Sequence, residues 1–260
     1  MSADPGPSDA LPPVDVLMAT FNSAETVQEA LAAVRETIPV HHLIVVDRFS
    51  TDGTPAIAAR FGAAVHSDES GVGAAYLKAL QLADTELVLF VDSDVILRRP
   101  DFYREALARL RRPRTAAVVG CSIGYPFEYG LPLGLTLIRR AWGLDAGLSL
   151  EAQGQETIAF RRAVRRRHEK VRYVRDAMDH RSTYRRVRTW AEWQGAQTRL
   201  IAGLSPYELA YSFLVVLLIH LNSRKLRNIA YTPIFWVKFL RGFSNPERWR
   251  TIDRRSAILT

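Results

Sequence analysis

Short apolar runs alternate with helix-like segments along the first half of the chain, and this alternation restricts the fold more than any other feature. The apolar runs predict strands at Val14–Ala19, Leu43–Asp47, Ala63–His66, Glu86–Asp92 and Ala116–Cys121. The intervening segments predict helices at Ser23–Thr37, Thr54–Phe61, Gly73–Ala83 and Asp101–Arg111. Near-continuous apolar strands separated by helices are typical of a mostly parallel sheet with helices on both faces. The expected fold class is therefore α/β.

Polar side chains directly follow three of the predicted strands. In open α/β sheets, ligands bind beyond the carboxyl ends of the strands. The residues of interest are therefore Thr20-Phe21-Asn22, Asp47, Asp92 and Asp94.

The segment LVLFVDSDV ends a fully apolar strand with two carboxylates that flank a serine, Asp92-Ser93-Asp94. A carboxylate at the end of a buried strand is costly unless a cation or hydrogen bonds compensate it. Oxygen ligands at this spacing suit Mg²⁺ or Mn²⁺, which share their coordination sphere with substrate phosphates. The alternative is an ordinary turn or helix cap built from Asp side chains.

Four segments occur in order, each in a strand–turn–helix setting: VDVLMATFNSAETV, LIVVDRFSTDGT, SGVGAAYLKAL and LVLFVDSDV. This series resembles the family 2 glycosyltransferases with the GT-A fold and, in part, the dolichyl-phosphate mannose synthases. The resemblance covers about residues 14–100 and implies a Rossmann-like GT-A sheet that binds a UDP- or GDP-linked sugar together with Mn²⁺ or Mg²⁺.

The resemblance implies that Thr20, Phe21 and Asp47 line the nucleoside pocket. The chain departs from the family at Arg48, where a second aspartate that reads the base is usual. An arginine there offers a fork of donors to base or phosphate acceptors, or it points to solvent.

The same resemblance implies that Asp94 is the main metal ligand and that Asp92 faces the ribose or the metal. It also implies that Gly71 and Gly73 let the backbone approach the sugar or the phosphates, since glycine lacks a side chain. Without the family, SGVG before a helix reads equally as a plain turn.

Residues 154–180 predict a basic helix at Gly154–Arg167 and a short strand at Val171–Val174. The family opens a helix here with a Gly-Glu-Asp-type segment that carries the catalytic base, and a histidine follows the later strand. By resemblance, Glu156 is the base and His180 completes the metal site. A capping role for Glu156 and a structural role for His180 are the alternatives.

This assignment implies an inverting mechanism, in which Glu156 removes the proton of an acceptor hydroxyl during a single displacement. A lipid phosphate acceptor is already ionised and needs no base. The expected catalytic residues are Glu156 and Asp94.

Charge is distributed unevenly along the chain. Residues 1–130 contain 17 Asp/Glu and 11 Lys/Arg, whereas residues 131–260 contain 24 Lys/Arg and 10 Asp/Glu. Such polarity indicates that the second half faces something anionic, although most of these arginines are expected simply to face solvent. No nucleic-acid-binding motif accompanies the charge, so nucleic acid is not an expected partner. The single cysteine, Cys121, cannot form an internal disulfide.

Two apolar segments near the C-terminus, Leu204–Leu221 and Ile229–Phe243, are rich in aromatic residues and are flanked by Arg and Lys. Such helices suit a bilayer interface, where anionic headgroups attract the basic face. A lipid-linked or isoprenoid-phosphate acceptor at the cytoplasmic face of the membrane would follow. The alternative is that the two helices cap the sheet or form a homodimer interface.

The expected organisation is a flexible Pro-rich tail at residues 1–13, a GT-A catalytic domain at 14–200 and a membrane-interacting helical segment at 201–260. The tail lacks the basic start and apolar run of a signal peptide.

Three other functions remain to be separated by experiment. A soluble glycosyltransferase with a small acceptor would use the same donor site. A nucleotidyltransferase would carry a Gly-rich phosphate loop after the first strand, where this chain has Ala-Thr-Phe-Asn-Ser. Arg48 and the imperfect GQET segment could instead mark a non-catalytic nucleotide-sugar-binding module.

Overall fold

The computed structural model describes residues 10–124, 130–148, 157–181, 189–222 and 226–250. Within them, eight strands form one sheet in the order β3-β2-β1-β4-β7-β6-β8-β5. The strands are β1 Val14–Thr20, β2 Val40–Asp47, β3 Ala63–Ser67, β4 Leu87–Val91, β5 Val95–Leu97, β6 Thr115–Ser122, β7 Leu135–Arg139 and β8 Lys170–His180.

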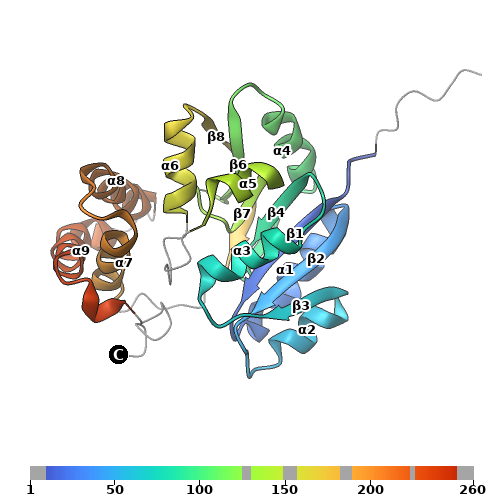
Figure 1. Ribbon diagram of the computed structural model, residues 1–260, viewed down its shortest axis with the longest axis horizontal. Coiled ribbons are helices and arrows are strands. Elements are labelled where there is room, and N and C mark those ends of the chain that lie inside the picture. The colour runs from blue at the N-terminus through green and yellow to red at the C-terminus, as the bar shows by residue number, and fades with distance from the viewer. Residues whose placement is uncertain (1–9, 125–129, 149–156, 182–188, 223–225, 251–260) are drawn as a thin grey trace, which may run out of the picture.

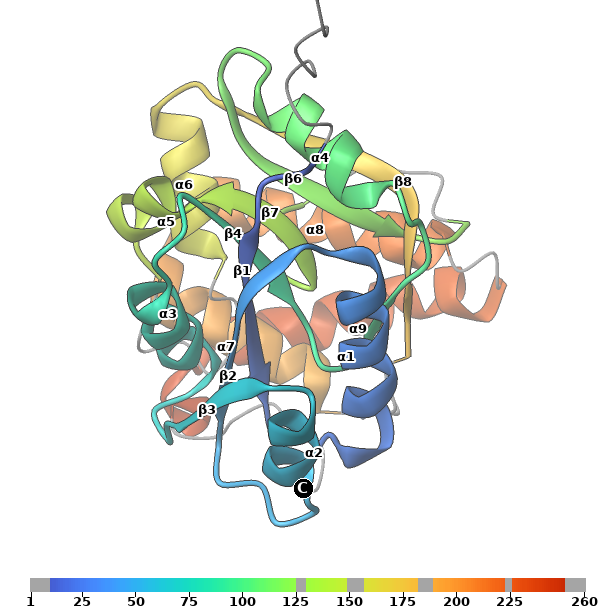
Figure 2. The ribbon, with the colours of Figure 1, turned by 90° about the vertical axis from the view of Figure 1, so that its right-hand side faces the viewer.

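Helices cover both faces of this sheet, as the apolar strands predict (Figure 2). One face carries α1 Ala24–Thr37, α2 Thr54–Arg60 and α4 Phe102–Leu110. The opposite face carries α3 Val72–Leu82, α5 Arg140–Ala146 and α6 Ile158–Arg166. This three-layer arrangement confirms the α/β class with a mostly parallel sheet.

Strand β1 contributes apolar side chains to the cores on both faces of the sheet. Val16 and Met18 belong to the core under α1, while Leu17 belongs to the core under α3. Successive side chains of a strand point to opposite faces, so a strand buried on both faces is apolar at most positions. The polar exceptions in β1 are Asp15 and Thr20. Helix α1 buries Val27, Ala30, Leu31 and Val34 against the first of these cores, at the i, i+3, i+4, i+7 spacing of an amphipathic helix.

Strands β3, β2, β1 and β4 pair in parallel, and β7 then joins β4 antiparallel. β7 lies in residues 122–150, where the sequence predicts no element. The short strand predicted at Val171–Val174 is longer in the structure, because β8 runs from Lys170 to His180 beside β6 and then pairs antiparallel with β5. This extension brings His180 into the sheet.

Three C-terminal helices, α7 Trp190–Ala202, α8 Pro206–Asn222 and α9 Leu226–Ser244, gather at one side of the sheet, beyond α6 (Figure 1). They bury Ala191, Val216, Phe235, Phe239 and Phe243 in a core of their own. The predicted domain boundary after residue 200 falls inside α7, which packs against α9.

Helices α7 and α9 touch through their backbones at two glycines. A Cβ on Gly195 would lie 1.9 Å from the carbonyl oxygen of Phe239, and a Cβ on Gly242 would lie 1.8 Å from that of Glu192. Both distances are far inside van der Waals contact, so only glycine fits at these two positions.

Large apolar side chains are exposed mainly on this helical group. Among the described residues, ten of the thirteen exposed ones lie between residues 204 and 240: Leu204, Tyr207, Phe213, Leu214, Leu221, Leu226, Ile229, Ile234, Val237 and Leu240. Across the described part of the chain, no helix combines the length and the hydropathy needed to cross a membrane.

Candidate active site

The carboxyl ends of β1 and β2 are joined by Asp47, whose side chain is 1% exposed. Thr20 donates its hydroxyl to Asp47 Oδ2 at 2.6 Å, and Ser50 donates its backbone N–H to Oδ1 at 2.7 Å and its hydroxyl to Oδ2 at 2.6 Å. A carboxylate accepts about four hydrogen bonds, so these three donors leave room for about one more. In this geometry the Asp47 carboxylate holds the ends of β1 and β2 and the loops that follow them together.

Phe21 and Arg48 lie side by side just past the same strand ends. The Arg48 guanidinium is 5.5 Å from the centroid of the Phe21 ring, within the range of a cation–π contact. Phe49, the next residue, is 61% exposed with a φ of 51°. An exposed aromatic ring beside Arg48 was not predicted, because nothing in the sequence distinguishes it from a core residue.

Gly71 and Gly73 lie at the start of α3. Gly71 precedes the first helical residue with a φ of 118°, a conformation that L side chains rarely adopt, and Gly73 is buried in the first turn. The backbone at Gly71 therefore needs glycine for its conformation.

Asp92, Asp94 and His180 come together at the end of β4, and we call these three residues the carboxyl-end cluster. One ligand atom from each lies within 4.8 Å of the others. His180 Nε2 is 3.1 Å from Asp94 Oδ1, and Val95 pairs with His180 where β5 meets β8. The register of that pairing is what carries a residue 86 positions further along the chain to Asp94.

Tyr76 is a member of this site that the sequence analysis missed. From α3 it donates its hydroxyl to Asp92 Oδ1 at 2.5 Å, and the Tyr76 side chain is 1% exposed. The GAAY segment contains this tyrosine, but only the packing of α3 on the sheet shows that its hydroxyl reaches Asp92. Tyr76 therefore orients the first carboxylate of the cluster.

The donor set of the carboxyl-end cluster fits a divalent ion of the Mg²⁺ or Mn²⁺ type. Two carboxylates supply hard oxygen atoms and an imidazole supplies one nitrogen, which leaves coordination positions for substrate phosphates. Glu156, the predicted base, lies outside the described residues.

A cavity of about 350 Å³ opens beside the carboxyl-end cluster. Asp92 and His180 line one part of it, and the end of β6 and the segment just before β7 line another. The C-terminal helices contribute a largely apolar wall made of Trp190, Gln194, Tyr211, Ser212, Val215, Val216, Ile219 and Phe239. One open cavity therefore borders both Asp92 of the carboxyl-end cluster and the apolar helical group.

Helix α6 fixes α8 across this space through arginines that the sequence does not distinguish from solvated ones. Arg161 donates to the buried Glu208 at 2.8 Å and to Thr157 at 3.0 Å, and its guanidinium lies 4.4 Å from the centroid of the Tyr211 ring. Arg165 lies 4.0 Å over the ring of Tyr207. The orientation of α8 relative to the sheet thus depends on an ion pair and two cation–π contacts.

The profile of "Glycosyl transferase family 2" matches residues 15–187. The match spans well over half of the chain and includes every strand of the sheet and the carboxyl-end cluster. The chain belongs to glycosyltransferase family 2.

A putative glycosyltransferase of Bacillus subtilis, EpsH, is 29% identical over 124 residues. The match covers 45% of this chain and 35% of EpsH, so the chain spans only about a third of that relative's length.

Solved structures share the fold at lower identity. A mannosyltransferase of Pyrobaculum calidifontis, solved in complex with GDP-Man and Mn²⁺, is 17% identical with a TM-score of 0.62, over 97% of this chain and 81% of that one. The glucosyl-3-phosphoglycerate synthase of Mycobacterium tuberculosis, solved with Mg²⁺ and UDP, is 20% identical with a TM-score of 0.55, over 74% and 78% of the two chains. The similarity to the mannosyltransferase includes the C-terminal helices, because it covers 97% of this chain.

Proposed function

We propose that the chain is a metal-dependent glycosyltransferase that moves a sugar from a UDP- or GDP-linked donor to an acceptor with an apolar part. The observation that carries this proposal is the cavity, which has Asp92 and His180 at one side and the apolar wall of α7–α9 at another. Family membership supports the reaction class, and the apolar wall supports the class of acceptor.

In this proposal Asp92, Asp94 and His180 would hold Mn²⁺ or Mg²⁺, and the bound ion would supply positive charge to stabilise the departing nucleoside diphosphate. Tyr76 keeps Asp92 in position through its 2.5 Å hydrogen bond. Thr20, Phe21, Asp47 and Arg48 surround the nucleoside, with Arg48 offering donors to the base or the phosphates.

The acceptor enters along the C-terminal helices, and its reacting oxygen attacks the anomeric carbon from the face opposite the diphosphate. One displacement of this kind inverts the configuration. For a hydroxyl acceptor, Glu156 stays the predicted base, and Thr157, the residue that follows it, lines the cavity. An isoprenoid phosphate is already ionised and is the acceptor that the apolar wall fits best.

Transfer assays would test the proposal directly. Full-length protein is incubated with UDP- and GDP-sugars, Mn²⁺, and either a short isoprenoid phosphate or a water-soluble sugar acceptor. We expect product with the isoprenoid phosphate, loss of product on adding EDTA, and recovery when Mn²⁺ is restored. If neither donor hydrolysis nor sugar transfer is observed, the protein is not an active transferase. If sugar is transferred only to the water-soluble acceptor, the proposed lipid acceptor is wrong.

We also propose that the exposed apolar side chains of α8 and α9 bind the surface of an anionic membrane. Val237 is 70% exposed and Leu240 48% exposed on α9, in the half of the chain that carries the excess of Lys and Arg. Aromatic and basic residues together favour the headgroup region.

Vesicle sedimentation separates this surface from a dimer interface. Val237→Glu with Leu240→Glu should lower binding to anionic phospholipid vesicles by at least about tenfold, because two apolar side chains no longer leave water. Leu82→Glu, at an exposed apolar residue on α3, is the matched control and should bind like the original protein. Equal binding of all three proteins, or loss of a dimer with unchanged vesicle binding, would contradict the proposal.

A further inference from the structure

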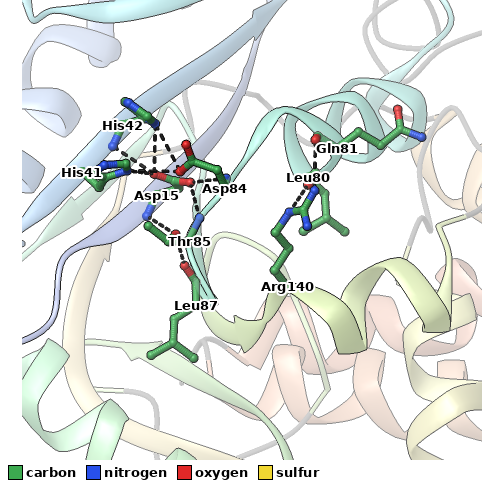
Figure 3. Close-up of polar contacts among 9 residues, drawn as sticks. All are labelled: Asp15, His41, His42, Leu80, Gln81, Asp84, Thr85, Leu87 and Arg140. Carbon is green, nitrogen blue, oxygen red and sulfur yellow. Dashed lines mark hydrogen bonds and ion pairs between the residues drawn. The ribbon is translucent and has the colours of Figure 1, made fainter.

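A second group of His and Asp side chains lies at the opposite end of the strands. The register between β1 and β2 slips by one residue between Val14 and Val16, so Asp15 alone faces two consecutive residues, His41 and His42. Consecutive residues of a regular strand point to opposite faces, and a bulge removes that alternation. Both rings consequently lie on the same side of Asp15, with centroids 3.9 Å apart (Figure 3).

Asp15 is fully buried and held in one orientation by backbone donors. His42 N–H donates to Oδ1 at 3.0 Å, while the N–H groups of Asp84 and Thr85 donate to Oδ2 at 2.7 and 3.0 Å. These three backbone donors hold the carboxylate in place before any ion binds.

Four ligand atoms converge in front of Asp15. His41 Nδ1 is 3.1 Å from Asp15 Oδ1 and 3.2 Å from Asp84 Oδ1, and His42 Nδ1 is 3.5 Å from each of the same two oxygens. A tetrahedral zinc ion with nitrogen and oxygen ligands at its usual bond lengths separates neighbouring ligand atoms by roughly 3.3–3.5 Å. The four nitrogen–oxygen distances, 3.1 to 3.5 Å, are within about 0.2 Å of this spacing, and all four ligand atoms lie within 4.8 Å of one another.

We propose that Asp15, His41, His42 and Asp84 form a second divalent-metal site, with two nitrogen and two oxygen ligands that favour Zn²⁺. Imidazole ligands distinguish it from the oxygen-rich carboxyl-end cluster, since they suit zinc better than Mg²⁺ or Mn²⁺. The site ties β1, β2 and the α3–β4 connection together, about 16 Å along β1 from the strand ends where the donor is proposed to bind. We call it the amino-end cluster, and it does not depend on the transferase activity.

An ion can reach this site from solvent. The side chains of His41, His42 and Asp84 are 41%, 51% and 62% exposed, whereas Asp15 closes the inner side. If the Nδ1–H groups only donate hydrogen bonds to the two carboxylates, the protein takes up no metal at this site, and metal titration separates the two cases.

Metal titration of untagged, EDTA-treated, full-length protein tests the site. The titrated parent protein carries Asp94→Asn, which removes a ligand from the carboxyl-end cluster, so that the titration measures metal binding at the amino-end cluster. We expect a single equivalent of Zn²⁺ by calorimetry and, with Co²⁺, the strong visible absorption of tetrahedral coordination. His41→Gln with His42→Gln keeps donors for the carboxylates but should abolish both signals and the rise in Tm on adding Zn²⁺.

His66→Ala, on β3, is the control for loss of a histidine elsewhere and should bind metal like its parent. Absence of uptake in the parent would overturn the proposal. Uptake that is unchanged in the double glutamine variant would also overturn it.

Discussion

The two ends of the parallel strands carry two clusters of the same residue types with different surroundings. The carboxyl-end cluster has two aspartates and one histidine and opens onto the cavity of about 350 Å³. The amino-end cluster has two aspartates and two histidines, and its inner carboxylate already accepts three backbone hydrogen bonds. The carboxyl-end cluster is open and rich in oxygen ligands, so a bound ion there keeps coordination positions for substrate phosphates. In the amino-end cluster the four side chains would complete the coordination of an ion, so the site can only stabilise the surrounding chain.

Asp94→Asn should have the largest effect, because it removes a charged ligand from the open cluster. We expect transfer to fall by roughly 100-fold or more, since one carboxylate fewer weakens both metal binding and stabilisation of the departing diphosphate. Steady-state transfer at saturating donor and a thermal shift with Mn²⁺ and donor would measure it. Asp145→Asn, an exposed carboxylate of α5, is the control. Equal transfer activity of both variants would contradict the role of the carboxyl-end cluster in catalysis.

Asp15→Asn should act on stability instead. The asparagine NH₂ faces backbone N–H groups that now donate to a carboxylate, so at least one buried donor loses its acceptor, at a cost of about 1–3 kcal/mol in the free energy of unfolding. Urea unfolding in the presence of EDTA measures this loss without a metal contribution. Asp84→Asn, whose side chain is 62% exposed, should change stability by less than about 0.5 kcal/mol. Equal losses in the two variants would show that burial of Asp15 does not matter.

The smallest expected effect is that of Val215→Trp, which narrows the cavity beside the carboxyl-end cluster. The amino-end cluster does not line this cavity. A larger side chain on this wall should raise the KM for the isoprenoid-phosphate acceptor by about tenfold, or about 1.4 kcal/mol, and leave the donor KM unchanged. Leu82→Trp introduces the same side chain at an exposed position of α3, away from the cavity, and should leave both constants unchanged. A rise in the donor KM alone would place the cavity on the donor side of the reaction.

Local pattern predicted the first half of the fold well. The strands and helices predicted between residues 14 and 121 differ from the structure by at most three residues at an element's end. The apolar runs of the strands and the helical spacing of apolar residues are both pronounced in this part of the chain. β5, β7 and α5 were not predicted, since β5 spans three residues and the other two lie in a Gly- and Leu-rich stretch without a regular hydrophobic period.

Site geometry was predictable only in part. His180 was assigned to the metal site by resemblance, and the structure brings it to Asp94 through the β5–β8 register. Tyr76, Arg161 and the apolar cavity wall carry no signal in the sequence, because an aromatic or arginine at helical spacing reads equally as core or as solvated surface. Their partners lie on elements far away along the chain.

The sequence by itself determined the α/β class, the family and the carboxylates that end β4, since apolar period and ordered strand-end motifs are local properties of the chain. Only the tertiary structure decided how the C-terminal helices meet the sheet and which side chains share a cavity with Asp92. It alone also decided that His41 and His42 face one carboxylate, because a one-residue slip between two strands changes side-chain direction without changing the hydrophobic pattern.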